Sequence, residues 1–283
     1  MESEQQIEQI REQQRNSWNT FSPGWKKWDT FNMEFLRPMG EAIIKNLHLK
    51  GNEHVLDVAT GTGEPGLTIA AKLPDGKVTG IDLSEDMLLI AHSNAQKKKI
   101  KNYETRAADV GDLTFKTESF DAISCRMGFM FFPSMEMAAT QLYRVLKPEG
   151  RISMTVWDEP EQNDWVTTIM DAIKKHISLP APLPEVPGMF RCSSARKMEE
   201  LLALTGFKDI SIQRISSTVD YESFERYWEI MLDVAAPVVA AMSAADENTK
   251  MMIRQETEKS FLAKNKTGEA ILNYSALVIS AHK

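Results

Sequence analysis

Short apolar runs alternate with amphipathic segments through the middle of the chain. The short apolar run at 55–58 and the segment 78–81 are predicted as strands, and 103–107, 120–124 and 151–157 are further strand candidates. Between them, segments 65–73, 86–98 and 134–146 are predicted as helices, and residues 147–150 form a turn before the last strand. Strands that alternate with helices of this length predict a parallel sheet covered on both faces.

The two ends of the chain have other patterns. Residues 4–20 are polar and rich in Gln and Glu, which predicts a marginal helix that must pack on something else. An aromatic-dense stretch follows, and a helix is expected at about 33–47. Beyond the middle region we expect a proline-rich loop at 180–188, a helix at 194–204, strands at 210–215 and 274–280, and a helical stretch at about 221–264. The predicted organisation is therefore an N-terminal helical and aromatic lid (1–50), a core (51–160), and a part that completes the sheet with helical insertions (161–283).

Composition narrows the class of protein. The 283 residues are 42% hydrophobic, enough for a sizeable core, and the net charge of −7 disfavours a broad nucleic-acid surface. The two cysteines, Cys125 and Cys192, are too few for a disulfide framework and are expected to be reduced thiols. Residues 2–16 lack the apolar run of a secretion signal, and no apolar stretch is long enough to span a membrane. We expect a soluble, cytoplasmic protein, and the sequence leaves its oligomeric state open.

A glycine-rich turn follows the first predicted strand. Gly61, Gly63 and Gly66 satisfy the pattern G-x-G-x-x-G, and Asp82 stands at the end of the next strand. The glycines let the backbone turn tightly and approach a ligand, and the acid accepts hydrogen bonds from ribose hydroxyls. This pattern alone fits a nicotinamide-dependent dehydrogenase and a methyltransferase equally.

Three features favour a methyltransferase. Asp57 lies in the strand itself, four residues before Gly61, where a carboxylate would oppose an anionic pyrophosphate but favour the cationic sulfonium and ammonium of S-adenosylmethionine (SAM). The turn comes after some fifty residues of helical sequence, whereas dehydrogenase fingerprints often begin a chain. Asp109, after the third strand, can accept a hydrogen bond from an adenine amino group.

Taken in order, five segments resemble the class I SAM-dependent methyltransferases, in the group that includes the ubiquinone and menaquinone C-methyltransferases. They are Val55–Gly63, Gly80–Ser84, Ala108–Val110, Phe120–Ile123 and Leu146–Gly150. The resemblance implies an α/β fold with a Rossmann-like, seven-stranded, mostly parallel sheet, helices on both faces, an N-terminal helical lid and a C-terminal helical insertion. The last strand would be antiparallel and lie beside the fifth. Ala59 departs from the usual glycine, and alanine fits there if its φ is negative.

The resemblance also implies cofactor-binding roles. The methionine end of SAM would lie against Asp57 and the turn, and Asp82 would bind the ribose. Leu83, Met87, Asp109 and Val110 would surround the adenine, while Cys125 and Arg126 would lie beside the methionine moiety and the methyl group. The turn residues concerned are Ala59, Thr60, Gly61 and Gly63. The product would be S-adenosylhomocysteine (SAH).

An apolar loop after the fourth strand suits a small hydrophobic or aromatic acceptor. Met127 and Phe129 of this loop, with Trp157 at the end of the fifth strand, are candidate substrate contacts. A lid that excludes water and faces the sulfonium would contain Trp18, Phe21, Trp25 and Trp28, and of these Trp25 and Trp28 are candidate substrate contacts. The alternative is that these aromatic residues only pack in the core.

Methyl transfer is a direct displacement, so a general base is needed only if the acceptor must lose a proton. His92, His176, Asp158 and Glu159 are candidates, the last two better placed after the fifth strand, and none is assigned. The spacing of His and acidic residues predicts no metal site. Two alternatives stay open, an NAD(P)-dependent oxidoreductase and a non-catalytic module that binds SAM or SAH. The accepting atom, carbon, oxygen, nitrogen or sulfur, is also open.

Overall fold

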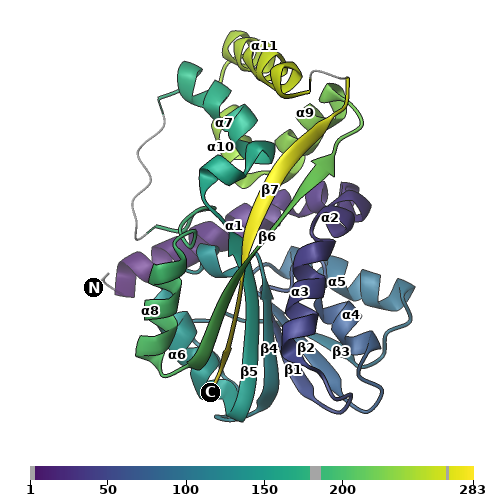
Figure 1. Cartoon of the computed structure of the whole chain (residues 1–283), viewed down its shortest axis with the longest axis vertical. Helices are drawn as coiled ribbons and strands as arrows, with labels where there is room; N and C mark the ends of the chain where they lie inside the picture. Colours follow the sequence, from purple (N-terminus) through teal and green to yellow (C-terminus); the bar gives the residue numbers. More distant parts are fainter. Residues whose placement is uncertain (1–3, 179–185, 266–267) are drawn as a thin grey trace.

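A seven-stranded sheet of order β3-β2-β1-β4-β5-β7-β6 forms the centre of the molecule (Figure 1). The computed structural model describes residues 4–178, 186–265 and 268–283. The first five strands are parallel, and β7 runs antiparallel between β5 and β6. The strands are β1 His54–Val58, β2 Lys77–Asp82, β3 Tyr103–Ala107, β4 Phe120–Arg126, β5 Leu146–Trp157, β6 Lys208–Asp220 and β7 Ile271–His282.

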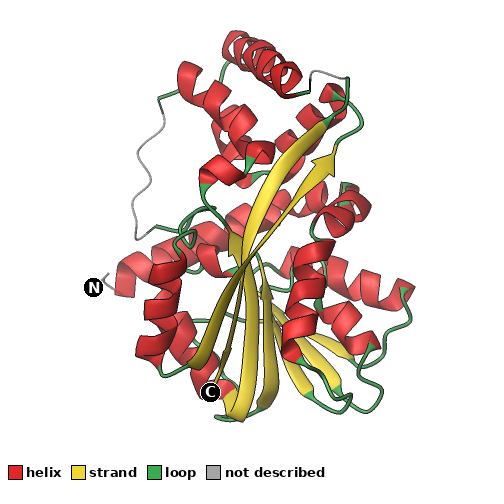
Figure 2. Cartoon of the chain, in the orientation of Figure 1, coloured by secondary structure: helices red, strands yellow, loops and turns green. Residues whose placement is uncertain are grey.

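Helices cover both faces of this sheet (Figure 2). Val55 of β1 packs in a buried cluster with Ile43 and Leu73 on one face, whereas Leu56 belongs to the larger cluster on the other face, with Leu142. A strand buried on both faces is apolar at successive positions, which explains why Val55 and Leu56 follow one another in β1. The helices around the sheet are α3 Arg37–Leu47, α4 Gly66–Ala71, α5 Glu85–Lys97, α6 Met135–Val145 and α8 Ala195–Thr205.

The last two strands extend beyond the rest of the sheet (Figure 1). Pairing between β5 and β7 ends at Trp157 and Ala276, but β6 and β7 stay paired up to Asp220 and Ile271. This extension reaches a second group of helices, α7 Asp164–His176, α9 Phe224–Val234, α10 Ala236–Ser243 and α11 Glu247–Lys264. The molecule therefore has a sheet layer and a helical part beyond the carboxyl ends of the parallel strands.

Helix α1 (Glu4–Lys27) runs across the boundary between these two parts (Figure 1). It contacts α5 on the sheet side and α9 on the helical side. At its end, Lys27 Nζ and Trp28 Nε1 both donate to Asp233 Oδ2 of α9, at 2.8 Å each. The short helix α2 (Asp29–Phe35) then leads back to α3 and the sheet.

The predicted fold class is confirmed, including the antiparallel strand β7 beside β5. Two details differ. The single helix expected at 33–47 is broken at Leu36, because Pro38 lacks the N–H that would continue the hydrogen bonds of α2. The turn expected at 147–150 lies within β5 as an irregularity, where pairing with β4 shifts and Glu149 has a φ of 60°.

Of the proline-rich loop, Pro180, Pro182 and Pro184 lie outside the described residues. Among the helices that the structure describes, none is long and apolar enough to cross a membrane.

Candidate functional site

A cavity lies at the carboxyl ends of β1, β2, β4 and β5, below α1 and the junction of α9 with α10. Ligands of open α/β sheets bind at this edge, near the point where the strand order reverses. We call the part of the lining after β2 and β3 the nucleoside half; it contains Ile81, Asp82, Leu83, Met87, Ala108, Asp109 and Val110, with Gln14 and Trp18 of α1 above. We call the opposite part the acceptor half; it contains Trp25, Asn32, Phe35, Leu36, Trp157, Trp165 and residues 234–236.

The glycine turn forms the floor between the two halves. Ala59, Gly61 and Gly63 all have positive φ, of 52°, 54° and 111°. The expectation of a negative φ at Ala59 is therefore wrong, and this alanine carries strain of about 1 kcal/mol that a glycine would avoid. Its methyl group lies close to Gly128, where an added Cβ would come within 2.5 Å of Ala59 Cβ.

Asp57 lies behind the turn and does not line the cavity. It is fully buried and accepts hydrogen bonds from Thr60 Oγ1 at 2.5 Å, Ser124 Oγ at 2.6 Å and Gly66 N at 3.1 Å. Burial raises the pKa of this carboxyl to about 6, against the opposing effect of these donors. Thr60 lines the cavity where the sequence predicted a contact from Asp57, and Asp57 holds the turn in shape from beneath. Gly63 is likewise outside the lining.

Asp82 lines the nucleoside half and ties the turn to helix α5. Its Oδ2 accepts from Gly61 N and its Oδ1 from Ser84 N, both at 2.9 Å. Burial raises the pKa of Asp82. Ser84 in turn caps α5 by accepting from Met87 N. The acid, Leu83 and Met87 therefore keep fixed positions at the place where the sequence predicts ribose and adenine.

Helix α1 covers the nucleoside half through three contacts. Arg11 forms an ion pair with Asp109, whose Oδ1 also accepts from Gly111 N at 3.0 Å. Ser84 Oγ donates to Asn19 Oδ1 at 2.6 Å. The ring of Trp18 lies edge-on to Phe131, with centroids 5.2 Å apart. Asp109 and Val110 line the cavity, as expected from the sequence. The ion pair from Arg11 of α1 to Asp109 was not predicted.

The end of β4 presents two neighbouring residues in opposite directions. Cys125 is buried outside the cavity, and burial raises the pKa of its thiol. Arg126 lines the cavity, and its guanidinium donates to Met33 Sδ at 3.6 Å. Burial lowers the pKa of Arg126, while the carboxylates of Glu64, Asp57 and Asp29 act in the other direction.

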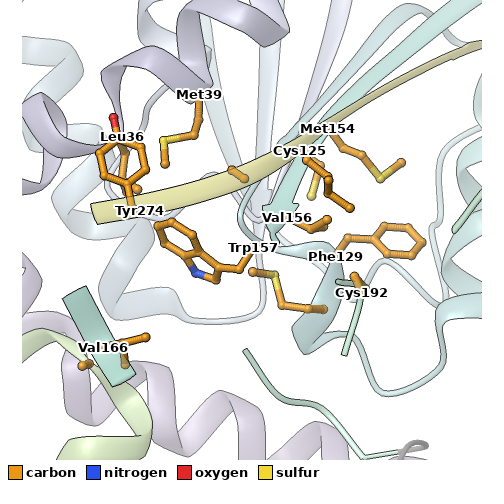
Figure 3. Close-up of a cluster of buried hydrophobic side chains, with 14 of the residues drawn as sticks. Leu36, Met39, Cys125, Phe129, Met154, Val156, Trp157, Val166, Cys192 and Tyr274 are labelled. Carbon is orange, nitrogen blue, oxygen red and sulfur yellow. The ribbon is translucent and has the colours of Figure 1, made fainter. Parts of the chain in front are cut away.

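Aromatic rings form the wall of the acceptor half. The Phe35 ring stacks on Trp157 at a centroid distance of 5.8 Å and meets Trp165 edge-on at 5.3 Å. Trp25 and Met127, two of the candidate substrate contacts, also line the cavity. Two other candidates do not: Trp28 is turned toward Asp233, and Phe129 lies in the buried cluster with Cys125 and Cys192 (Figure 3).

Several lining residues escaped the sequence analysis. Glu64 lies inside the G-x-G-x-x-G segment and was passed over because the pattern leaves that position free. Asn32, Phe35, Leu36, Trp165 and residues 234–236 come from helices that carry no recognisable motif. Only the aromatic density around Phe35 was a signal that could have been used.

None of the four candidate bases lines the cavity. Asp158 is buried in an ion pair with Arg214 and accepts from Ser275 Oγ at 2.9 Å. Burial opposes ionisation, but these donors lower its pKa overall. His92 and His176 are exposed on α5 and α7. Within the described ranges, no group of three or more His, Cys, Asp or Glu residues could hold a metal ion.

A doubly wound sheet with a glycine turn, an acid after β2 and a cavity above both is the arrangement of a nucleotide- or nucleoside-binding α/β protein. Residues 49–206, more than half of the chain, match the family described as methyltransferase domain. The chain belongs to this family, and its fold is the one that the resemblance to class I SAM-dependent methyltransferases predicted.

Similar proteins include the demethylmenaquinone methyltransferase of Symbiobacterium thermophilum, 34% identical over 129 residues that cover 45% of this chain and 47% of that protein. The nocamycin O-methyltransferase of Saccharothrix syringae is 29% identical over 154 residues, covering 52% of this chain and 55% of its own. This chain thus spans about half the length of these curated relatives. The crystal structure of the YcgJ protein from Bacillus subtilis has a TM-score of 0.60 at 18% identity, covering 87% of this chain and 98% of that one, and supports the fold.

Proposed function

We propose that this protein transfers the methyl group of SAM to a small hydrophobic or aromatic acceptor. The observation that carries the proposal is one continuous cavity with two chemically different halves. The nucleoside half has an acid, Asp82, held at the glycine turn, and the acceptor half is walled by aromatic rings. The names of the two curated relatives agree with a small-molecule acceptor.

The residues assigned to SAM follow from this division. Asp82 would bind the ribose, Leu83 and Met87 the adenine face, and Asp109 with Val110 the adenine edge. Thr60 and Gly61 would contact the methionine end, with Asp57 supporting them from behind. The residues fit this ligand because the nearby carboxylates favour its two positive charges.

Bound SAM supplies an electrophilic methyl group on a sulfonium, which the acceptor atom attacks as the carbon–sulfur bond breaks. The protein's part is to align the two molecules and to exclude water. Helix α1 and the junction of α9 with α10 close the cavity from above. The aromatic rings of Phe35, Trp157 and Trp165 would hold a flat, apolar acceptor.

The alternative of an NAD(P)-dependent oxidoreductase is disfavoured by charge. Asp57 and Glu64 both lie at or beside the glycine turn, where a dinucleotide would place its anionic pyrophosphate. A non-catalytic SAM-binding module is disfavoured by the acceptor half, because a cavity serving the cofactor alone has no use for a second aromatic compartment.

Calorimetric titration with SAM, SAH and NADH tests the proposal, with Asp82→Ala as the comparison variant. We expect SAM and SAH to bind, NADH not to bind, and Asp82→Ala to lose both adenosyl ligands. Formation of SAH with a panel of aromatic acceptors then separates an enzyme from a binding module. Binding of NADH, or of none of the three ligands, would contradict the proposal.

A further inference from the structure

Asn32 is a polar residue in a part of the cavity that is mostly apolar and aromatic. It lines the acceptor half, it is 1% exposed, and its Nδ2 has no hydrogen-bond partner among the described residues. A buried amide N–H without an acceptor is costly, because it has lost its bonds to water and gained none in the protein. An unpaired donor at the wall of a ligand cavity therefore points to an acceptor atom on the ligand.

Trp25 carries a second unpaired donor on the same side of the cavity. Trp18, Trp25 and Asn32 follow one another at intervals of seven residues, and all three line the cavity. Helical hydrogen bonds continue through the turn between α1 and α2, from Trp28 N to Gly24 O at 3.0 Å and from Asn32 N to Trp28 O at 2.8 Å. Residues seven apart thus face the same way. Trp25 Nε1 is buried and has no partner in the described part of the chain.

Two other tryptophans have paired indole groups. Trp28 Nε1 donates to Asp233 Oδ2 at 2.8 Å, and Trp165 Nε1 donates to Asn163 Oδ1 at 3.2 Å. Buried indole N–H groups usually find such a partner. The described members of the acceptor half include no acidic side chain, since apart from the two unpaired donors they are Phe, Leu, Trp, Val and Ala. The oxygen that these donors lack is therefore expected on a bound molecule.

We propose that the methyl acceptor is an aromatic compound with an oxygen beside its ring, and that Asn32 Nδ2 donates a hydrogen bond to this oxygen. This inference rests on the proposed function and deepens it by naming a feature of the acceptor. The rings of Phe35, Trp157 and Trp165 hold the flat part of the molecule, and Asn32 fixes its rotation in the plane of the ring. Trp25 supplies a second donor on the same side. Because an analogue without the oxygen leaves the amide unpaired, Asn32 determines specificity.

The test compares two probes of similar shape, acetophenone and isopropenylbenzene, which differ only in a C=O group in place of C=CH₂. The ketone accepts a hydrogen bond and cannot donate one, so it tests the Nδ2 end of the amide. Ligand-observed NMR gives the dissociation constants of both probes from the SAH-loaded wild type and from SAH-loaded Asn32→Leu. The ratio of the two constants is compared between the proteins, because the greater hydrophobicity of the alkene then cancels.

Between the wild type and Asn32→Leu, the preference for the ketone should fall by about 5- to 50-fold. Asn32→Ala removes the amide without adding apolar bulk, and it should lower the preference in the same direction. A fall in Asn32→Leu alone would show obstruction by the leucine and overturn the inference. Asn16→Leu makes the same substitution at an exposed position of α1 outside the cavity, and it should leave the preference unchanged.

Two further measurements separate a contact with the acceptor from other roles of Asn32. The free energy of unfolding of Asn32→Leu in urea should equal or exceed that of the wild type, because an apolar group replaces an unpaired amide. The affinity of Asn32→Leu for SAH should equal that of the wild type. A marked loss of stability would assign the amide a structural role, and a loss of SAH affinity would assign it to the cofactor. Either result would overturn the inference.

A preference for the ketone that is unchanged in both Asn32 variants would overturn the inference and leave the proposed function standing. A wild type that binds SAH but neither probe would overturn it together with the aromatic nature of the acceptor. Failure of the wild type to bind SAH would contradict the proposed function itself, and the inference with it.

Discussion

A methyl group at position 59 couples the glycine turn to the loop after β4. Ala59 has a φ of 52°, and its Cβ occupies the space that a Cβ on Gly128 would need. The sequence shows which residue departs from the family pattern but not the backbone angle at that position. The expectation of a negative φ failed for this reason, since φ here is set by the approach of the turn to β2 through the bond from Thr60 N to Ile81 O.

This coupling predicts non-additive effects. Ala59→Gly should raise the free energy of unfolding by about 0.5–1 kcal/mol by relieving the strain. Gly128→Ala should lower it by about 1–3 kcal/mol because its methyl group collides with that of Ala59. The double variant should be more stable than the sum of the two single effects predicts, because Ala59→Gly removes the methyl group with which the one added by Gly128→Ala collides. Urea denaturation of the four proteins measures the coupling, and strict additivity would show that the two methyl groups do not meet.

Asp57 predicts a dependence of stability on pH. Its pKa is raised from 3.8 to about 6 in the folded protein, so folding favours the protonated form. The resulting stabilisation is complete below about pH 4 and is lost as the pH rises through the folded-state pKa. Relative to Asp57→Asn, the wild type should therefore lose about 2–3 kcal/mol of unfolding free energy between about pH 4 and pH 8. The difference in unfolding free energy between the two proteins cancels the contributions of the other titrating groups. A difference that does not change with pH would show that the pKa of Asp57 is not raised by folding.

At the scale of elements, helix α1 holds the nucleoside half closed. It reaches Asp109 through Arg11, Ser84 through Asn19, and Phe131 through Trp18. These contacts connect α1 to three separate segments that follow β2, β3 and β4. Because α1 also meets α9, a ligand below it is enclosed unless the helix moves.

Breaking one of these contacts should make release of the ligand faster. In Arg11→Met the ion pair with Asp109 is lost, and dissociation of SAH should speed up by about fivefold or less, as expected for a partly exposed ion pair. Lys26→Met changes an exposed lysine on the same helix and should leave the rate unchanged. Stopped-flow displacement of SAH measures both variants. A rate in Arg11→Met equal to or below that of the wild type would show that α1 is not a closing element.

The elements differ in how far the sequence predicts them. Strands β1, β2 and β4 were predicted because burial on both faces makes them rich in apolar residues. The glycine turn and its acids were predicted because their residues are close together in the sequence. The break at Leu36 was missed because the apolar pattern runs on across Pro38. The acceptor half could not be predicted, since Phe35, Trp165 and Ala235 meet only after the chain has folded.

At the scale of the whole molecule, the long pair β6 and β7 determines where the acceptor half lies. Their extension past Trp157 reaches the helical part from which α7 and the α9–α10 junction face the strand ends (Figure 1). The sheet thus supplies the nucleoside half, while segments far apart in sequence supply the acceptor half. A change confined to one half should leave the other intact, because they share only the glycine turn and the end of β4.

Ala236→Phe tests this separation, since Ala236 lines the acceptor half at the start of α10. The added ring should obstruct the acceptor, so methyl transfer should fall by more than about tenfold while SAH affinity changes by about twofold or less. Ala240→Phe places the same ring on the exposed side of α10 and should leave both quantities unchanged. SAH formation and calorimetry give the two readouts. If SAH affinity falls in parallel with turnover, the ring at position 236 also obstructs the cofactor. The two halves are then one compartment, and the separation of cofactor and acceptor sites is wrong.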